Sequence, residues 1–326
     1  KLINKRPKMS KIVILDIATV TKGDLAFDAI SNLAPTSTYE ITKPEEVIER
    51  VKDSEIIITN KVAFPKDVIE QLPNLKLIAI FATGYDSIDI EACRKHNISV
   101  VNVADYSSYS VVQTIFAHLL NLTQKINQHD EFVHNGDWAK SEIFSCWQGK
   151  LHELAGQTFG IIGFGNIGRK LAILAEALAM KVIIHTAHPE KYTDYDFNFV
   201  QMDELLSNSD IISLNLPATT DNEGFINKSS LAKMKKSAIL INCSRGKLIN
   251  EVDLADSLNN EQIAYACLDV LATEPPKADN PLLSAKNCQI TPHIAWATIE
   301  ARARIIKETA LNIEAFLNGE KRNNIT

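Results

Sequence analysis

The sequence lacks the features that mark a membrane-spanning, secreted or disulfide-stabilised protein. Its strongest apolar run, residues 75–82, includes Lys76 and is far shorter than the ~20 residues that a membrane-spanning helix needs. No apolar stretch of the signal-peptide kind follows the basic residues 1–8. The five cysteines are odd in number and form no C-x-x-C pair, which excludes a disulfide framework and a zinc site of that type. We therefore expect a cytoplasmic protein with reduced thiols.

The sequence also has little of what nucleic-acid-binding, hydrolytic or metal-dependent proteins require. Lys and Arg number 34 against 40 Asp and Glu, a net charge of −6 that argues against a nucleic-acid partner. Neither a G-x-S-x-G nor a Walker A sequence occurs. His185 and His188 have no third ligand nearby, so we predict no metal site. Most other histidines, His118 among them, belong to no motif and are expected to have surface or structural roles.

What the sequence does contain is an alternation of strand-like and helix-like segments in two sets. Its 326 residues, 45% of them hydrophobic, suffice for two globular domains. Alternation of this kind predicts parallel sheets covered by helices on both faces. One long helix is expected over residues 110–135 and a last one over 297–317. Strands are expected at residues 11–16, 38–41, 55–59, 75–82 and 99–103, and then at 158–162, 181–185, 211–214, 238–242, 263–268 and 288–290.

A glycine-rich run lies between an expected strand and an expected helix near the middle of the chain. Gly163, Gly165 and Gly168 have the spacing G-x-G-x-x-G. In that context the first glycine permits a tight turn, the second lets the backbone approach a pyrophosphate, and the third lets helix and strand pack closely. The N–H groups of Asn166 and Ile167 would face the phosphate charge at the helix N-terminus. The run therefore predicts a dinucleotide site.

Three polar residues follow apolar, strand-like runs late in the chain. Arg245, Glu274 and His293 each come shortly after an expected strand of the second set. Ligands of open α/β sheets bind outside the carboxyl ends of the strands, so these side chains are expected to converge near a bound dinucleotide. Taken singly, each also has a structural explanation. Arg245 could belong to a surface turn, Glu274 could be a solvated loop charge, and His293 could be a structural histidine.

Together these motifs resemble the D-2-hydroxyacid dehydrogenase family over residues 11–319. Five segments carry the resemblance: residues 82–89, 163–168, 242–246, 268–275 and 292–298. Within the family, residues 59–62 and the loop containing Trp138, Phe144 and Trp147 are similar to those of glycerate dehydrogenases, also called hydroxypyruvate reductases.

The resemblance implies two doubly wound parallel-sheet α/β domains. A flavodoxin-like substrate-binding domain would comprise residues 9–104 and 293–326, with a Rossmann domain for NAD(P) at 105–292. The active site would lie in a cleft between the domains. The family is usually dimeric, with the region 110–156 in the interface, so a homodimer is expected. Met9 is interpreted as the natural start, and residues 1–8 as a tag or an upstream remnant.

The resemblance also implies a role for each polar residue. His293 would protonate the carbonyl oxygen of a 2-keto acid while hydride moves from the nicotinamide to the carbonyl carbon. Glu274 would hydrogen-bond the other imidazole nitrogen, and Arg245 would bind the substrate carboxylate with its planar fork. Further substrate contacts are expected from Asn60, Lys61, Thr83 and Gly84. Further cofactor contacts are expected from Thr186, His188, Pro217, Cys243 and Asp269, in addition to the glycine run.

One position departs from the dinucleotide fingerprint. An NAD site usually has an acid at the end of its second strand, and Thr186 occupies that place here. His188 and Lys191 add positive charge nearby. Both cofactors therefore stay open, with a slight preference for NADP over NAD.

The expected activity is reduction of hydroxypyruvate or glyoxylate to D-glycerate or glycolate. Two alternatives remain. The first is a dehydrogenase for another 2-hydroxy acid, such as D-lactate. The second is a dinucleotide-sensing binding protein of the same fold without catalytic turnover.

Overall fold

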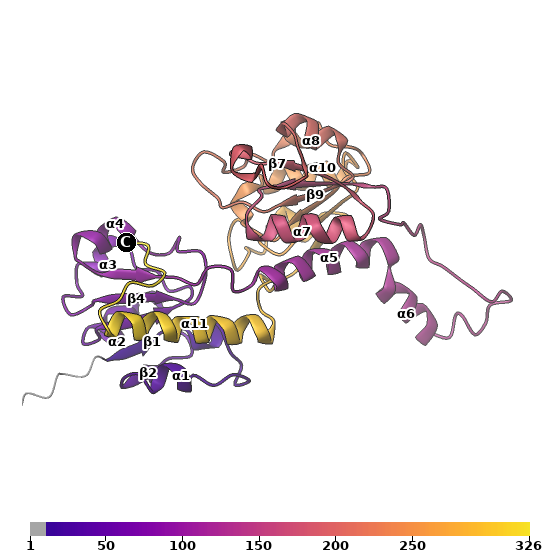
Figure 1. Ribbon diagram of the computed structural model, residues 1–326. Coiled ribbons are helices and arrows are strands. Elements are labelled where there is room, and N and C mark those ends of the chain that lie inside the picture. The colour runs from indigo at the N-terminus through magenta and orange to yellow at the C-terminus, as the bar shows by residue number, and fades with distance from the viewer. Residues whose placement is uncertain (1–10) are drawn as a thin grey trace, which may run out of the picture. The chain divides into compact units, whose positions relative to one another are not determined.

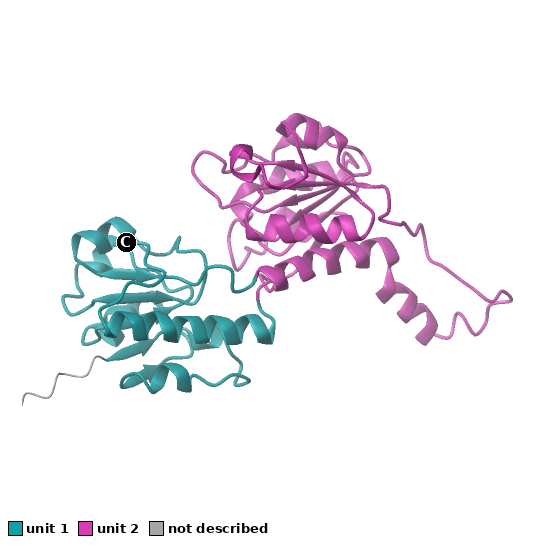
Figure 2. Ribbon diagram, in the orientation of Figure 1, with its two compact units in different colours: residues 1–107, 297–326 teal, residues 108–296 magenta. Residues whose placement is uncertain are grey.

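The computed structural model describes residues 11–326, which form two compact units (Figure 2). Unit 1 contains the chain up to Ser107 together with Ala297–Thr326, and unit 2 is Ser108–Trp296. The chain thus leaves the first unit once and returns to it with its last helix. These boundaries lie a few residues beyond the expected ones at 104 and 293. The expected tag at residues 1–8 lies outside the described residues.

Unit 1 is built on a five-stranded parallel sheet in the order β2-β1-β3-β4-β5. This order is that of flavodoxin-like folds. All residues of β3 and β4 are buried, as expected for strands that have helices on both faces. The strands are β1 (Ile12–Ile14), β2 (Thr36–Thr38), β3 (Ile56–Thr59), β4 (Leu77–Ile80) and β5 (Ser99–Val101).

Short helices and one long C-terminal helix cover this sheet. The long helix α11 (Ile299–Leu317) packs against α1 and β4, so the last segment of the chain belongs to unit 1. Thr298 caps its N-terminus by accepting from the Ala301 N–H, and Gly319, at φ +77°, follows its end. The others are α1 (Asp28–Ser31), α2 (Val47–Val51), α3 (Lys66–Ile69), α4 (Ile90–Lys95) and the 3₁₀ turns η1 (Ile17–Thr19) and η2 (Pro44–Glu46).

Unit 2 contains a seven-stranded parallel sheet in the order β12-β11-β10-β9-β6-β7-β8. Counted from β6, the order is that of a Rossmann sheet with one additional strand, and the strand order reverses between β6 and β9, which are parallel. The two-residue edge strand β8 was not expected from the sequence. The strands are β6 (Thr158–Ile162), β7 (Lys181–His185), β8 (Asn198–Phe199), β9 (Ile211–Leu214), β10 (Ile239–Asn242), β11 (Tyr265–Leu268) and β12 (Cys288–Ile290).

The single helix expected over residues 110–135 is in fact two helices. Lys125 adopts a left-handed conformation, with φ +51°, which breaks the helix between α5 (Ser108–Gln124) and α6 (Ile126–His134). The remaining helices of unit 2 are α7 (Asn166–Ala177), α8 (Met202–Asn208), α9 (Lys228–Leu231), α10 (Glu251–Asn259) and the 3₁₀ turns η3 (Pro189–Tyr192), η4 (Gly246–Leu248) and η5 (Pro281–Leu283).

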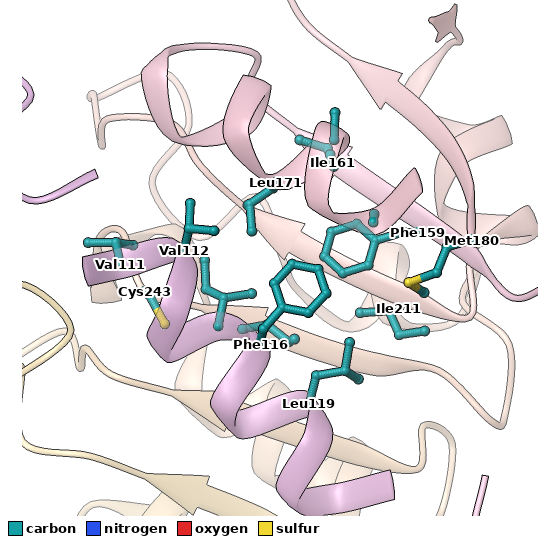
Figure 3. Packing of buried hydrophobic residues seen from close by; sticks show 14 of the residues in the cluster. Val111, Val112, Phe116, Leu119, Phe159, Ile161, Leu171, Met180, Ile211 and Cys243 are labelled. Atoms are coloured by element: carbon teal, nitrogen blue, oxygen red, sulfur yellow. The ribbon is translucent and has the colours of Figure 1, made fainter. Parts of the chain in front are cut away.

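Helices α5 and α7 cover one face of the unit 2 sheet (Figure 1). The buried side of α5 includes Phe116, whose ring stacks on Phe159 of β6 at a centroid distance of 5.9 Å. Leu119 of α5 and Leu171 of α7 extend the same apolar cluster, which Figure 3 shows. Helix α5 is therefore anchored in this apolar cluster from Val111 to Leu119. Within residues 11–326, no helix is both long enough and apolar enough to cross a membrane.

Candidate active site

The glycine loop connects β6 to α7 at the point where the strand order reverses. Gly163 has φ +94°, and a Cβ there would lie 2.4 Å from the Asn215 carbonyl oxygen. A Cβ on Gly168 would lie 2.2 Å from the Gly163 carbonyl oxygen. A Cβ on Gly165 would meet no described atom within 4 Å. The first and third glycines are thus required by the fold, whereas Gly165 faces open space beside the N-terminus of α7, as a pyrophosphate cradle requires.

Two alanine substitutions separate these roles. Gly165→Ala is expected to keep the melting temperature and to weaken dinucleotide binding, because its methyl group fills the space that the phosphates need. Gly168→Ala is expected to lower the melting temperature, because its Cβ meets backbone that cannot move cheaply. Thermal unfolding and fluorescence titration with NADPH measure both effects. Equal cofactor affinity in Gly165→Ala and the unchanged protein would contradict the expectation that the pyrophosphate binds beside Gly165.

An aromatic cluster holds the glycine loop against the segment after β7. Phe164, between the first two glycines, is buried and packs edge to face against Tyr192, Tyr195 and Phe199. The ring centroids are 5.0–5.4 Å apart. Such edge-to-face pairs stabilise beyond their buried area. The cluster therefore fixes the loop that follows Thr186 relative to the phosphate cradle.

The end of β7 carries the residues expected to face the adenosine ribose. Thr186 is half-buried, and His188 is exposed. His188 Nδ1 lies 3.1 Å from Glu190 Oε1 in an exposed pair. Glu190 therefore brings a negative charge to the place where His188 and Lys191 were expected to favour a 2′-phosphate. Sequence reasoning did not weigh this acid, and it reduces the preference for NADP.

Arg245 lies in a turn directly after β10, and Asn242 builds that turn. The Asn242 side chain is fully buried, donates to the Arg245 carbonyl oxygen at 2.8 Å and accepts from the Ser244 N–H at 3.0 Å. The half-buried Arg245 guanidinium donates to the Ser244 carbonyl oxygen. A Cβ on Gly246 would lie 1.9 Å from the Leu271 carbonyl carbon. The Arg245 turn and the loop leading to Glu274 are therefore in backbone contact.

Glu274 and His293 form a hydrogen-bonded pair. Glu274 Oε2 lies 2.5 Å from His293 Nδ1, and Glu274 Oε1 accepts from the Leu271 N–H at 3.0 Å. Both side chains keep about a third of their surface exposed, at 33% and 28%. The carboxylate thus holds the imidazole by one nitrogen and leaves Nε2 as the ring nitrogen for a reacting group. β10, β11 and β12 are adjacent and parallel, so Arg245, Glu274 and His293 arise from one edge of the sheet.

The loop that carries His293 is held by Asp269, which directly follows β11. The Asp269 carboxylate is buried and accepts from Thr291 Oγ1 at 2.6 Å, from the Ile294 N–H at 2.9 Å and from the Ala295 N–H at 2.8 Å. The His293 N–H donates to the Asp269 carbonyl oxygen at 2.9 Å. Within this framework His293 has φ +54°, a conformation that non-glycine residues rarely adopt.

The remaining cofactor positions lie along the same edge. Pro217 follows β9, the strand next to the glycine loop. Cys243 follows β10, and its side chain packs in the apolar cluster of Figure 3. Burial raises the pKa of the Cys243 thiol well above its ordinary value. A cofactor contact at this position would therefore come from its backbone. In the part of the chain that the structure describes, no three His, Cys, Asp or Glu side chains gather as a metal site.

In unit 1, Asn60 and Lys61 directly follow β3, and Asp16, which sequence reasoning missed, holds them. The Asp16 carboxylate accepts from the Asn60 N–H at 2.9 Å and from the Lys61 N–H at 2.7 Å. Burial raises the pKa of this carboxyl group, although these N–H donors act in the opposite direction. Asn60 is buried and donates to Thr19 Oγ1, while Lys61 is exposed. The signal for Asp16 was its place directly after an apolar run.

Thr83 and Gly84 lie after β4, the neighbour of β3 in the same sheet. Thr83 Oγ1 donates to the Val103 carbonyl oxygen at 2.7 Å, and the Asn102 side chain donates to the Thr83 carbonyl oxygen at 2.7 Å. The turn is thereby fixed to the segment after β5. All four residues expected to bind substrate thus lie near the carboxyl edge of the unit 1 sheet.

Comparison with known proteins identifies similar sequences over most of the chain. The family model "D-isomer specific 2-hydroxyacid dehydrogenase, NAD binding domain" matches residues 116–295. A hydroxypyruvate reductase from Blautia hydrogenotrophica is 41% identical over 313 residues, which cover 95% of this chain and 97% of that protein. A glycerate dehydrogenase from Methylorubrum extorquens is 40% identical over 288 residues, covering 87% and 90%.

Solved structures share the fold. An acyclic imino acid reductase in complex with NADPH and D-Arg has a TM-score of 0.84 at 32% identity, with 97% of this chain and 100% of that chain covered. A protein from Thermus thermophilus also has a TM-score of 0.84, at 26% identity, with 97% and 100% covered. The two-sheet architecture expected from the sequence is therefore confirmed.

Proposed function

Because the chain belongs to the D-isomer specific 2-hydroxyacid dehydrogenase family, we propose that it reduces hydroxypyruvate and glyoxylate to D-glycerate and glycolate. The cofactor is NADPH or NADH. The observation that carries the proposal is the hydrogen-bonded pair of His293 and Glu274, which shares a sheet edge with Arg245. The similar proteins named hydroxypyruvate reductase, glycerate dehydrogenase and glyoxylate reductase support the choice of substrates.

The proposed reaction needs a proton at the carbonyl oxygen as hydride arrives at the carbonyl carbon. The bound nicotinamide supplies the hydride. His293 delivers the proton from Nε2, since Nδ1 is engaged by Glu274. The Glu274 carboxylate holds the imidazole by Nδ1 and so fixes the orientation of the ring. In the oxidation of a 2-hydroxy acid, His293 accepts the proton instead.

Arg245 is proposed to bind the substrate carboxylate. A guanidinium offers parallel N–H donors that match the two oxygens of a carboxylate. The buried Asn242 fixes the Arg245 backbone, so the fork is positioned before substrate binds. Asn60, Lys61, Thr83 and Gly84 are proposed as further substrate contacts, and Pro217, Cys243 and Asp269 as cofactor contacts, together with the glycine loop, Thr186 and His188.

Glu274→Gln tests the proposed pairing through pH dependence. As a general acid, His293 must be protonated, so the rate of reduction falls as pH rises. The substitution removes the carboxylate that contacts His293 Nδ1 at 2.5 Å, so the pH–rate profile is expected to change. The measurement is kcat/KM for hydroxypyruvate between pH 5 and 9. A profile identical to that of the unchanged protein would remove Glu274 from the mechanism.

A panel of 2-keto acids with both cofactors tests the proposed function. Hydroxypyruvate and glyoxylate are expected to be reduced faster than pyruvate or phosphorylated acids, with a small preference for NADPH. Thr186 in place of an acid removes repulsion toward a 2′-phosphate, while Glu190 beside His188 limits the preference. Fastest turnover of pyruvate would support a D-lactate type enzyme. Tight cofactor binding without turnover of any acid would support a dinucleotide sensor.

A homodimer is proposed from the exposed apolar residues after α5. In and near the loop that follows α6, Trp138, Ile143, Phe144 and Trp147 are 47–90% exposed. Exposed apolar clusters of this size mark interaction surfaces. A second copy of the chain is the proposed occupant. Sedimentation should show a dimer that Phe144→Lys with Trp147→Lys dissociates, and a monomeric unchanged protein would contradict the proposal.

A cytoplasmic location is proposed from the thiols. All five cysteines are unpaired, and Cys93 and Cys267 are buried. Burial raises the pKa of Cys93 to about 11 and that of Cys267 to about 12, so these thiols stay protonated and unreactive. Such a set is typical of proteins in a reducing compartment.

A further inference from the structure

The loop that carries His293 is tied to helix α5 at both of its ends. Near the start of α5, Ser110 Oγ donates to the Ala295 carbonyl oxygen at 2.5 Å. About two helical turns later, His118 Nε2 lies 3.3 Å from Thr291 Oγ1. Ser110 and His118 are each only 4% exposed. The contacts come from residues far apart in sequence, so only the folded chain joins them.

Hydrogen-bond direction along this contact follows from the donors available. The Thr291 hydroxyl gives its single proton to Asp269 Oδ1, at 2.6 Å. Toward His118 the hydroxyl can therefore only accept, which assigns a proton to His118 Nε2. The result is a directional chain from α5: His118 donates to Thr291, and Thr291 donates to Asp269. Asp269 in turn accepts the N–H groups of Ile294 and Ala295.

The end of this chain is the strained backbone of His293. A residue at φ +54° keeps that conformation only where its surroundings determine it. Here the His293 N–H is bound by the Asp269 carbonyl oxygen, and the following two N–H groups are bound by the Asp269 carboxylate. The His293 ring meets Glu274 from this backbone position. Loss of the hydrogen bond from Thr291 would therefore loosen the Asp269 carboxylate, which fixes the backbone around His293 and so the direction of its imidazole.

We propose that His118 is a positioning residue for the reaction at His293, acting through Thr291 and Asp269, with Ser110 as the second attachment of the same loop to α5. The proposal rests on the proposed role of His293 as general acid. Helix α5 suits this task because its apolar face is anchored in the core of unit 2 (Figure 3). The loop that carries His293 is thereby attached to a helix that is held rigidly by its packing.

Burial is consistent with a neutral His118. Desolvation lowers the pKa of its imidazole, and the Gln289 side chain and the Asp269 charge oppose this only in part. A neutral imidazole still carries one N–H, so His118 can donate to Thr291 without being charged.

The test compares two substitutions at His118 in the full-length protein. His118→Leu keeps an apolar volume and removes the donor, whereas His118→Gln offers an amide N–H to Thr291. For hydroxypyruvate reduction, His118→Leu is expected to lower kcat between about tenfold and 100-fold, since small misplacement of a reacting group has effects of this size. KM and the NADPH dissociation constant should change less than kcat. His118→Gln should recover most of kcat.

Two further variants separate positioning from packing. Thr291→Val removes the link and should lower kcat like His118→Leu. The variant that carries both His118→Leu and Thr291→Val should have a kcat no lower than either single variant, because both substitutions break the same chain of hydrogen bonds. Thr123→Val is the matched control: it removes another buried α5 hydroxyl, one that donates to the Leu119 carbonyl oxygen and not to the His293 loop. It should keep kcat even if its melting temperature falls.

The outcomes distinguish this inference from the proposed function. If unchanged protein reduces hydroxypyruvate while His118→Leu and Thr291→Val keep its kcat and pH profile, His118 only packs and the inference is overturned. If His118→Leu does not fold, the other two variants decide. Unchanged kcat in His118→Gln together with lowered kcat in Thr291→Val supports the hydrogen-bonded chain from His118 to Asp269. Unchanged kcat in Thr291→Val rejects it. Unchanged protein inactive on every 2-keto acid would overturn the proposed function, and this inference with it.

Discussion

Replacing His293 by Asn is expected to lower kcat for hydroxypyruvate reduction by about 100- to 10,000-fold, the usual contribution of general acid catalysis. Asparagine keeps a polar side chain of similar reach but cannot deliver a proton at neutral pH. It also tolerates positive φ better than most residues, so the φ of +54° at this position should persist. The loss should therefore be chemical rather than structural.

The controls for this prediction are cofactor affinity and a second histidine. The NADPH dissociation constant and the melting temperature of His293→Asn should stay close to those of the unchanged protein. His96 lies exposed at the end of α4, in unit 1, and His96→Asn should leave kcat unchanged. If His293→Asn retained more than a tenth of the kcat of the unchanged protein, another group would have to donate the proton.

Replacing Arg245 by Gln is expected to lower kcat/KM for hydroxypyruvate by about 100- to 1,000-fold. The loss of one partner from a desolvated, hydrogen-bonded charge pair costs about 2–5 kcal/mol, or about 30- to 5,000-fold, and the expected loss lies inside that interval. Arg245→Lys keeps the positive charge but lacks the parallel N–H donors of the guanidinium, so its kcat/KM should lie between those of Arg245→Gln and the unchanged protein. Steady-state kinetics with the 2-keto acid varied at saturating NADPH measures both variants.

Lys247 provides the matched control for Arg245. It lies two residues further on, is exposed, and approaches Glu223 only at 4.0 Å. Lys247→Gln removes the same charge from the same turn and should leave kcat/KM within about twofold, as is usual for surface substitutions. If Lys247→Gln and Arg245→Gln had equal effects, the general charge of the turn would matter and a specific carboxylate site at Arg245 would be rejected.

Most strands could be predicted from the sequence because they are short apolar runs between turn residues. The runs at β3 and β10 are buried along their length and that at β6 after its first residue, so their hydrophobicity marks them directly. β2 lies two residues before its expected start, and β8 was missed. Both are edge strands, only partly buried, so the hydrophobic pattern there is weak.

The break between α5 and α6 illustrates a different limit. The apolar pattern continues through Lys125, and no glycine or proline marks the end of α5. The left-handed residue that ends it is a lysine, for which that conformation is unfavourable. Tertiary contacts on either side, such as the Gln124 side chain donating to the His152 carbonyl oxygen, determine where the helix stops.

The sequence alone determined the fold class, and it predicted the reacting groups of the candidate site. The glycine spacing, and the positions of Arg245, Glu274 and His293 after apolar runs, carry that information because turns and strand ends follow local rules. The tertiary structure alone revealed the supporting residues Asp16, Asn242, Ser110 and His118. Their roles depend on hydrogen bonds to distant segments, and no local pattern distinguishes a buried polar residue that holds a loop from one that merely packs.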